Sequence, residues 1–166
     1  MEDLLTERLV LHPFTVAEAE RLVAAGAAPE GGYPTAMDVA GARRYLEVCA
    51  RDGDPRPFGA FEVRVRADGR AIGGAGFHGA PDDEGAVTIG YGLIEAARGH
   101  GYAAETLREL LRFARAAGAA RVKGDTDRGN VASQRVMAAA GMRLVAEDDE
   151  LRYYELGWPE PAVTVL

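Results

Sequence analysis

The sequence has few of the features that mark secreted or membrane proteins. Among its 166 residues the only cysteine is Cys49, which excludes an internal disulfide framework. No uncharged apolar run approaches the ~20 residues that a membrane helix requires. The first residues are acidic and no apolar segment follows them, so we expect no secretory signal peptide. These absences favour a soluble cytoplasmic protein without a membrane partner.

Basic residues are also too few for a typical nucleic-acid-binding protein. The chain has 19 Lys and Arg against 26 Asp and Glu, a net charge of −7 at pH 7. The charge is uneven, because residues 98–143 hold nine basic and four acidic side chains. We interpret this segment, with its local balance of +5, as one placed to meet an anion.

What is present indicates one α+β domain over residues 1–166. The composition is 48% hydrophobic and 27% charged, which is ordinary for a globular chain of single-domain length. A capping box at Thr15 and Glu18 predicts a helix that ends at Gly26. Asp38 is predicted to cap a second helix that ends near residue 52. Period-two patterns over 61–65, 71–77 and 87–93 then predict an antiparallel meander.

The second half of the chain alternates strands and helices. An amphipathic stripe from Ala103 to Ala114 predicts a long helix that ends at Gly118, and residues 121–125 follow as a strand. Asn130 is predicted to cap another helix, which stops at Gly141. Residues 144–156 suggest a final hairpin. Gly90 and Gly92 inside a strand indicate a bulge or a close backbone approach.

The loop Arg98-Gly-His-Gly-Tyr-Ala103 lies between a predicted strand and the long helix. Two glycines let the backbone turn tightly and bring its N–H groups close to a ligand. The first N–H groups of a helix have no internal partner and carry the positive end of its dipole. Because Arg98 adds a permanent positive charge, we predict a phosphate site here.

A dinucleotide-binding fold is an alternative for this loop. Gly99, Gly101 and Ala104 match G-x-G-x-x-A, and Asp125 follows at about the right distance. That fingerprint, however, opens a series of parallel βαβ units, whereas a hairpin meander precedes the loop here. No GxxxxGK[ST] string occurs, which excludes a P-loop nucleotidase.

Several short motifs resemble the GNAT N-acetyltransferase superfamily. Arg98-x-x-Gly101-x-Ala103 resembles its R/Q-x-x-G-x-G/A signature, between the fourth strand and the third helix of that fold. Other motifs resemble the RimJ/RimL-like branch, which contains the ribosomal-protein N-terminal acetyltransferases. They are Thr6–Leu11, Ile89–Tyr91, Gly101–Thr106, Asn130–Ser133 and Ala140–Met142.

This resemblance implies a fold and a cofactor. The fold would be a mixed, mostly antiparallel sheet of about seven strands, splayed in the middle and flanked by about four helices. Acetyl-CoA would be the acetyl donor. The backbone at Leu93 and Ile94 would bind the pantetheine arm or the thioester carbonyl. The pyrophosphate would lie on Arg98, Gly99, His100, Gly101, Tyr102 and Ala103, and Asn130 and Ser133 would face the far end of the arm.

The resemblance also implies direct attack of an amine on the thioester, with protonation of the leaving thiolate. Many family members protonate it with a tyrosine at the position of Met137, so Ser133 is our candidate acid. The glutamate that often precedes Ile-Gly-Tyr in this branch is Thr88 here. Candidate replacements as the base are Glu84 in the preceding turn and His78, which can titrate near neutrality.

We therefore predict an acetyl-CoA-dependent N-acetyltransferase without a metal site. The acceptor would be a primary amine, either a small molecule or a peptide N-terminus, and a homodimer is one of the oligomeric states that the sequence leaves open. Because the tyrosine and the glutamate are absent, a non-catalytic acyl-CoA sensor is an alternative. A dinucleotide-binding protein is a second alternative.

Overall fold

The computed structural model describes residues 1–159, and residues 160–166 of the predicted domain lie outside the described part. Eight strands, four α-helices and one short 3-10 helix make up this part. In chain order they are β1 (Leu4–Leu5), β2 (Leu9–Pro13), α1 (Val16–Ala25), α2 (Ala36–Asp52), β3 (Ala60–Val65), β4 (Ala71–Phe77), β5 (Ala86–Leu93), η1 (Glu95–Ala97), α3 (Tyr102–Ala116), β6 (Arg121–Asp127), α4 (Val131–Ala139), β7 (Arg143–Glu147) and β8 (Leu151–Gly157).

The strands form one sheet in the order β1-β2-β3-β4-β5-β6-β8-β7. Every neighbouring pair is antiparallel except β5 and β6, which are parallel. The predicted mixed, mostly antiparallel α+β fold is therefore confirmed. The count of about seven strands misses β1, which has only two residues and shows no periodicity.

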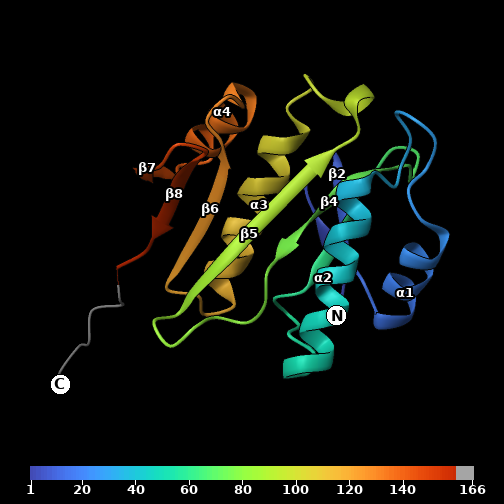
Figure 1. Ribbon diagram of the computed structural model, residues 1–166, viewed down its shortest axis with the longest axis horizontal. Helices are drawn as coiled ribbons and strands as arrows, with labels where there is room; N and C mark the ends of the chain where they lie inside the picture. Colours follow the sequence, from blue (N-terminus) through green and yellow to red (C-terminus); the bar gives the residue numbers. More distant parts are fainter. Residues whose placement is uncertain (160–166) are drawn as a thin grey trace.

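The sheet opens between β5 and β6. Ala86–Thr88 pair with Arg121–Lys123, and beyond that point the two strands separate. From there β5 stays paired with β4 as far as Leu93, and β6 stays paired with β8. Figure 1 shows β5 and β6 diverging toward the top of the view. We call this opening the splay. It confirms the prediction of a sheet splayed in the middle.

The β4–β5 ladder runs in regular register past Gly90 and Gly92, so the predicted bulge is wrong. The register shifts of this sheet lie between other strands, at Val63/Arg64 and Leu144/Ala146. A close approach by a neighbouring side chain explains one of the two glycines. A Cβ on Gly90 would lie 3.1 Å from Nε2 of His78.

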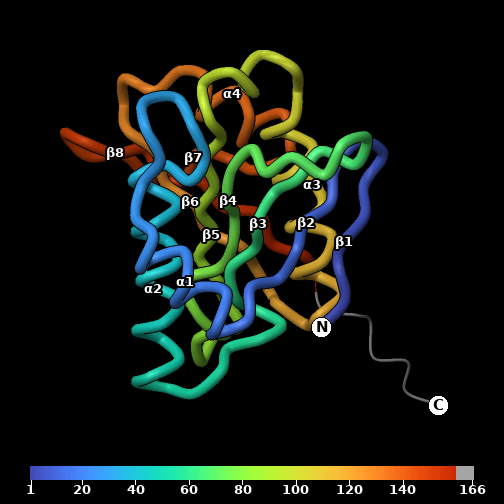
Figure 2. The backbone as a smooth tube through the Cα atoms, turned by 90° about the vertical axis from the view of Figure 1, so that its right-hand side faces the viewer, coloured from blue at the N-terminus to red at the C-terminus, as the bar shows by residue number. Residues whose placement is uncertain are grey.

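Helices cover both faces of the sheet (Figure 2). The larger core lies between the strands and α3, which buries Leu107, Leu110 and Leu111 against Phe61 and Val122. A smaller core joins α1 and α2 to the opposite face around residues such as Ala19, Ala42 and Tyr45. The two faces are therefore built separately, with α3 on one side and α1 and α2 on the other.

Local capping signals decide where the first two helices start. Thr15 caps α1 and forms the predicted capping box with Glu18. For α2 the prediction is wrong by three residues, because Thr35 is the cap and Asp38 is its capping-box partner. A threonine followed three residues later by a carboxylate satisfies two backbone donors, which Asp38 alone cannot do. This shift places Asp38 inside the first turn of α2.

Within residues 1–159, no helix is long and apolar enough to cross a bilayer.

Candidate active site

The predicted phosphate loop lies where β5 ends beside the splay. After η1, the chain passes through Gly99 at φ 82° and Gly101 at φ 81° before α3 begins. Both values lie in the left-handed region, which disfavours any residue with a Cβ. The loop conformation therefore depends on glycine at these two positions.

The N-terminus of α3 differs from those of the other three α-helices. Side chains of Thr15, Thr35 and Asn130 cap α1, α2 and α4, whereas Gly101 gives α3 no side-chain cap. The amide of Glu105 donates to the Gly101 carbonyl at 3.1 Å, and the amides before it have no partner within the helix. These N–H groups, at the positive end of the helix dipole, make this end of α3 a candidate anion site.

Glu105 fixes this loop to the start of β2. Its carboxylate accepts hydrogen bonds from the Thr6 hydroxyl, from the Arg8 amide at 2.9 Å and from Arg8 Nε at 2.8 Å. Arg8 also donates to the His100 carbonyl at 2.8 Å and stacks 4.6 Å from the Tyr102 ring centroid. Burial acts to raise the pKa of Glu105, but the bonds from Thr6 and Arg8 hold it below its usual value.

Sequence reasoning did not identify Arg8 as a site residue. The one signal was the motif Thr6–Leu11, which we used only for its resemblance to an opening strand. The structure brings Arg8 and Glu105 together across 97 residues of sequence. Arg8 therefore belongs to the structure that supports the loop.

The edge of β5 that faces the splay offers backbone groups to an extended ligand. The Ile94 amide donates to the Ile72 carbonyl of β4 at 2.8 Å. Because bonded and non-bonded pairs alternate along an antiparallel ladder, Leu93 and Tyr91 direct their backbone N–H and C=O groups away from β4. The backbone N–H of Leu93 is thus open on this edge, whereas the N–H of Ile94 is already bonded. Nε of Arg98 donates to the Leu93 carbonyl at 3.2 Å.

A tyrosine and a serine meet across the splay. Oη of Tyr91, from β5, lies 3.0 Å from Oγ of Ser133, in the first turn of α4. Burial raises the pKa of Tyr91, so its phenol stays protonated at neutral pH. Met137 is buried and carries no proton to donate. The Tyr91–Ser133 pair is therefore a proton-bearing group beside the splay, and Tyr91 is the member that the sequence did not identify as a proton donor.

Asn130 has a structural task in addition to its predicted role in cofactor binding. Its Oδ1 accepts the Ser133 amide at 3.0 Å and so caps α4. Asn130→Ala is expected to lower the free energy of unfolding by about 1 kcal/mol, whereas Asn130→Asp, which keeps the acceptor, costs only a few tenths, about 0.3 kcal/mol. Urea denaturation of both variants measures this. Equal losses in the two variants would contradict the capping role.

A pocket opens beneath α2, on the face of the sheet that α1 and α2 cover. It has a volume of about 110 Å³, room for several water molecules. Its floor includes four strand glycines, and its rim includes Asp38 and Arg44 from α2, Tyr33 from the preceding loop and His78 directly after β4. Since Tyr91 also lines it, the pocket adjoins the splay.

The structure brings His78 to this pocket but not Glu84. Nε2 of His78 accepts a hydrogen bond from Arg44 at 3.1 Å, and burial together with the Arg44 charge lowers the pKa of His78. Glu84 is exposed in the turn before β5 and lies 3.9 Å from Arg121. That turn is at the opposite end of β5 from the loop, about 20 Å along the strand from Gly90.

The basic segment is less concentrated around the loop than we predicted. Arg98 and His100 belong to the loop, but Arg115 lies in the last turn of α3. Arg121 and Lys123 pair with the start of β5, at the far end from the loop. The anion site therefore depends mainly on backbone amides and not on the local balance of +5. Within the described residues, no three side chains of His, Cys, Asp or Glu are placed to hold a metal ion.

Comparison with known proteins agrees with this geometry. Residues 8–143 match the acetyltransferase (GNAT) domain family. The chain belongs to this family, so it is an N-acetyltransferase, and its family uses acetyl-CoA as the donor.

Individual relatives are distant in sequence but similar in fold. The uncharacterized N-acetyltransferase YjdG of Bacillus subtilis is 22% identical over 111 residues, which cover 66% of each chain. A GNAT-family acetyltransferase of Bordetella pertussis is 26% identical, with 93% of this chain and 99% of that chain covered and a TM-score of 0.67. RimL, a ribosomal L7/L12 acetyltransferase solved with coenzyme A, is 16% identical, with 94% and 98% covered and a TM-score of 0.66.

Proposed function

We propose that this protein transfers the acetyl group of acetyl-CoA to a primary amine by direct attack within a ternary complex. The observation that carries the proposal is the combination of an uncapped α3 N-terminus with an open β5 edge. The loop from Arg98 to Ala103 would bind the pyrophosphate, and the backbone of Tyr91 and Leu93 would bind the arm. The acceptor would enter from the pocket beneath α2, so that the two substrates meet at the splay.

The chemistry requires a neutral amine and a protonated leaving group. The amine nitrogen forms a bond to the thioester carbonyl carbon, the C–S bond breaks, and sulfur leaves as thiolate. An ammonium of pKa near 10 must first lose a proton, and the cationic nitrogen of the tetrahedral intermediate loses a second one as the amide forms. Water in the pocket beneath α2 would accept these protons, assisted by its polar rim. Of the two base candidates predicted from the sequence, His78 lines this pocket and Glu84 does not.

Ser133 would protonate the thiolate, with Tyr91 resupplying its proton through the 3.0 Å hydrogen bond. A thiol of pKa ~8.5 is already a fair leaving group, so this contribution is moderate. Positioning of the two substrates would supply much of the rate.

The test is thiol release from acetyl-CoA across a panel of primary amines and peptides with free N-termini. We expect turnover with at least one acceptor and a 1:1 ratio of free thiol to acetylated amine. Binding of acetyl-CoA by calorimetry without turnover on any acceptor would instead support the sensor alternative. A bound nicotinamide cofactor would support the dinucleotide alternative.

A further inference from the structure

The pocket beneath α2 is shaped by a group of glycines on neighbouring strands. Glu62 of β3 is opposite Gly74 of β4, which in turn is opposite Gly92 of β5. The next row along the same face contains Gly76 and Gly90. Glycine in a strand interior weakens the sheet, and its use often marks a close approach by a ligand or another group. The four glycines in these two rows add no side chains of their own to this face, which leaves room for groups from α2 and from His78.

The space above two of these glycines is already used by polar atoms. A Cβ on Gly74 would lie 2.8 Å from Oδ1 of Asp38, and one on Gly90 would lie 3.1 Å from Nε2 of His78. Above Gly92 the nearest atom is Cε of Met37 at 4.0 Å. The pocket therefore has a polar group at each end and open space near the splay.

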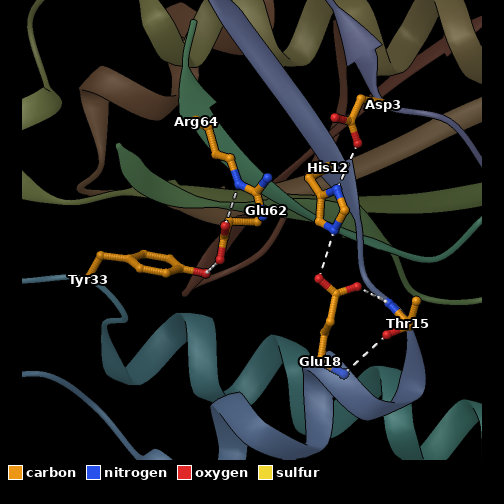
Figure 3. Close-up of polar contacts among 7 residues, drawn as sticks. All are labelled: Asp3, His12, Thr15, Glu18, Tyr33, Glu62 and Arg64. Atoms are coloured by element: carbon orange, nitrogen blue, oxygen red, sulfur yellow. Dashed lines mark hydrogen bonds and ion pairs between the residues drawn. The ribbon is translucent and has the colours of Figure 1, made fainter. Parts of the chain in front are cut away.

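Asp38 has one oxygen committed to structure and one available. Oδ2 accepts both the amide of Thr35, at 2.8 Å, and its hydroxyl, at 2.9 Å, which completes the capping box. Oδ1 has no hydrogen-bond partner among residues 1–159 and lies over Gly74. The nearby carboxylate of Glu62 is already bonded to Tyr33 and Arg64 (Figure 3). Burial, and to a lesser degree the Glu62 charge, raises the pKa of Asp38, and an ammonium group beside Oδ1 would offset both effects by favouring the carboxylate form.

Arg44 contributes a positive charge to the pocket, opposite in sign to that of the Asp38 carboxylate. It lies six residues after Asp38 on α2, about 9 Å further along the helix axis. Its bond at the pocket is to His78 Nε2, a neutral acceptor, and no carboxylate lies within salt-bridge distance among the described residues. The two rim charges therefore stand at separate points of one small pocket, and neither is neutralised by the other.

We propose that this pocket selects a compact zwitterionic acceptor: a primary amine whose ammonium group binds Asp38 Oδ1 and whose anionic group binds Arg44. The inference rests on the proposed acetyl transfer and specifies its acceptor class. A pocket of about 110 Å³ suits a small molecule better than the N-terminal segment of a protein.

The experiment compares three series of acceptors at matched chain length: ω-amino acids of three to six carbons, the corresponding alkylamines, and the corresponding diamines. A tetrapeptide amide with a free N-terminus completes the panel. For the wild-type protein we expect the highest kcat/KM with an ω-amino acid, at least about tenfold above the alkylamine of the same length, in line with one charge-assisted contact.

Variants then test each end of the pocket. Arg44→Gln should abolish the preference for the ω-amino acid over the alkylamine, measured as the ratio of their kcat/KM values in the same variant, whereas Arg43→Gln, its exposed neighbour outside the pocket, should leave that ratio unchanged. Asp38→Asn keeps an oxygen for the Thr35 bonds and should lower kcat/KM for all amines at least about tenfold. Its control is Glu18→Gln, the equivalent capping-box position of α1, which should lower stability only.

The outcomes separate this inference from the proposed function. Acetylation that is best with alkylamines, diamines or the peptide, or a preference unchanged in Arg44→Gln, would overturn the zwitterionic acceptor while acetyl transfer stands. An Asp38→Asn rate equal to that of Glu18→Gln would overturn the role of Asp38. No turnover with any acceptor, despite acetyl-CoA binding, would refute the proposed function itself and the inference with it.

Discussion

Replacing Gly101 by valine is expected to weaken acetyl-CoA binding by about 100-fold or more. Gly101 has a φ of 81°, and a Cβ there would lie 3.3 Å from Nη2 of Arg8. A β-branched residue would leave the left-handed region and turn the first amides of α3 away from the anion site. Loss of two hydrogen bonds to a charged group, about 1.5 kcal/mol each, corresponds to that factor. Isothermal calorimetry with acetyl-CoA measures it.

Gly118→Val provides the matched control for this substitution. Gly118 follows the other end of α3, has a φ of 98°, and a Cβ added to it would have no other atom within 4 Å. The two variants therefore carry a similar backbone strain, but only one of them lies at the loop. We expect similar losses of unfolding free energy and a change of affinity in Gly101→Val alone. Unchanged affinity in Gly101→Val would mean that the pyrophosphate does not bind at this helix.

Most of the fold follows from signals local in sequence. The capping box at Thr15, the turn glycines and the period-two strands each involve residues within a few positions of one another, and the structure confirms the elements that they predict. The start of α2 was misplaced because Asp38 resembles a cap when Thr35 is not considered together with it. The splay was expected only from the family resemblance, because the sequence of one strand does not indicate where the neighbouring strand separates from it.

The candidate site depends on contacts between distant segments. Tyr91 and Ser133 are 42 residues apart, and Arg8 and Glu105 are 97 residues apart. Periodicity within one strand or helix carries no information on such pairs. The loop at Gly99 and Gly101 is predictable from the sequence because its glycines and the helix that follows are adjacent in sequence. The base candidate Glu84 was chosen by nearness in sequence, and the strand carries it to the end of β5 away from the loop.

The second large effect is expected at the pair that bridges the splay. Ser133→Ala should lower kcat for amine acetylation on the order of 10- to 100-fold, and Tyr91→Phe should lower it by a similar factor. Affinity for acetyl-CoA should fall by a smaller factor than kcat, because neither change touches the loop that would bind the pyrophosphate. Steady-state kinetics and calorimetry on the same preparations separate the two quantities.

Two readouts distinguish proton donation from a merely structural role. If Tyr91 and Ser133 act as one unit across their 3.0 Å hydrogen bond, the double variant should be no slower than the slower single variant. With an acetyl thioester of a more acidic thiol, the thiolate leaves without being protonated. The kcat of each variant should then be close to that of the wild-type protein. A loss that is the same for both thioesters would assign the pair to packing of α4 against β5. Donation by the pair would explain how a chain with Met137 in place of the family's tyrosine still protonates its leaving group, because β5 supplies the phenol that α4 lacks.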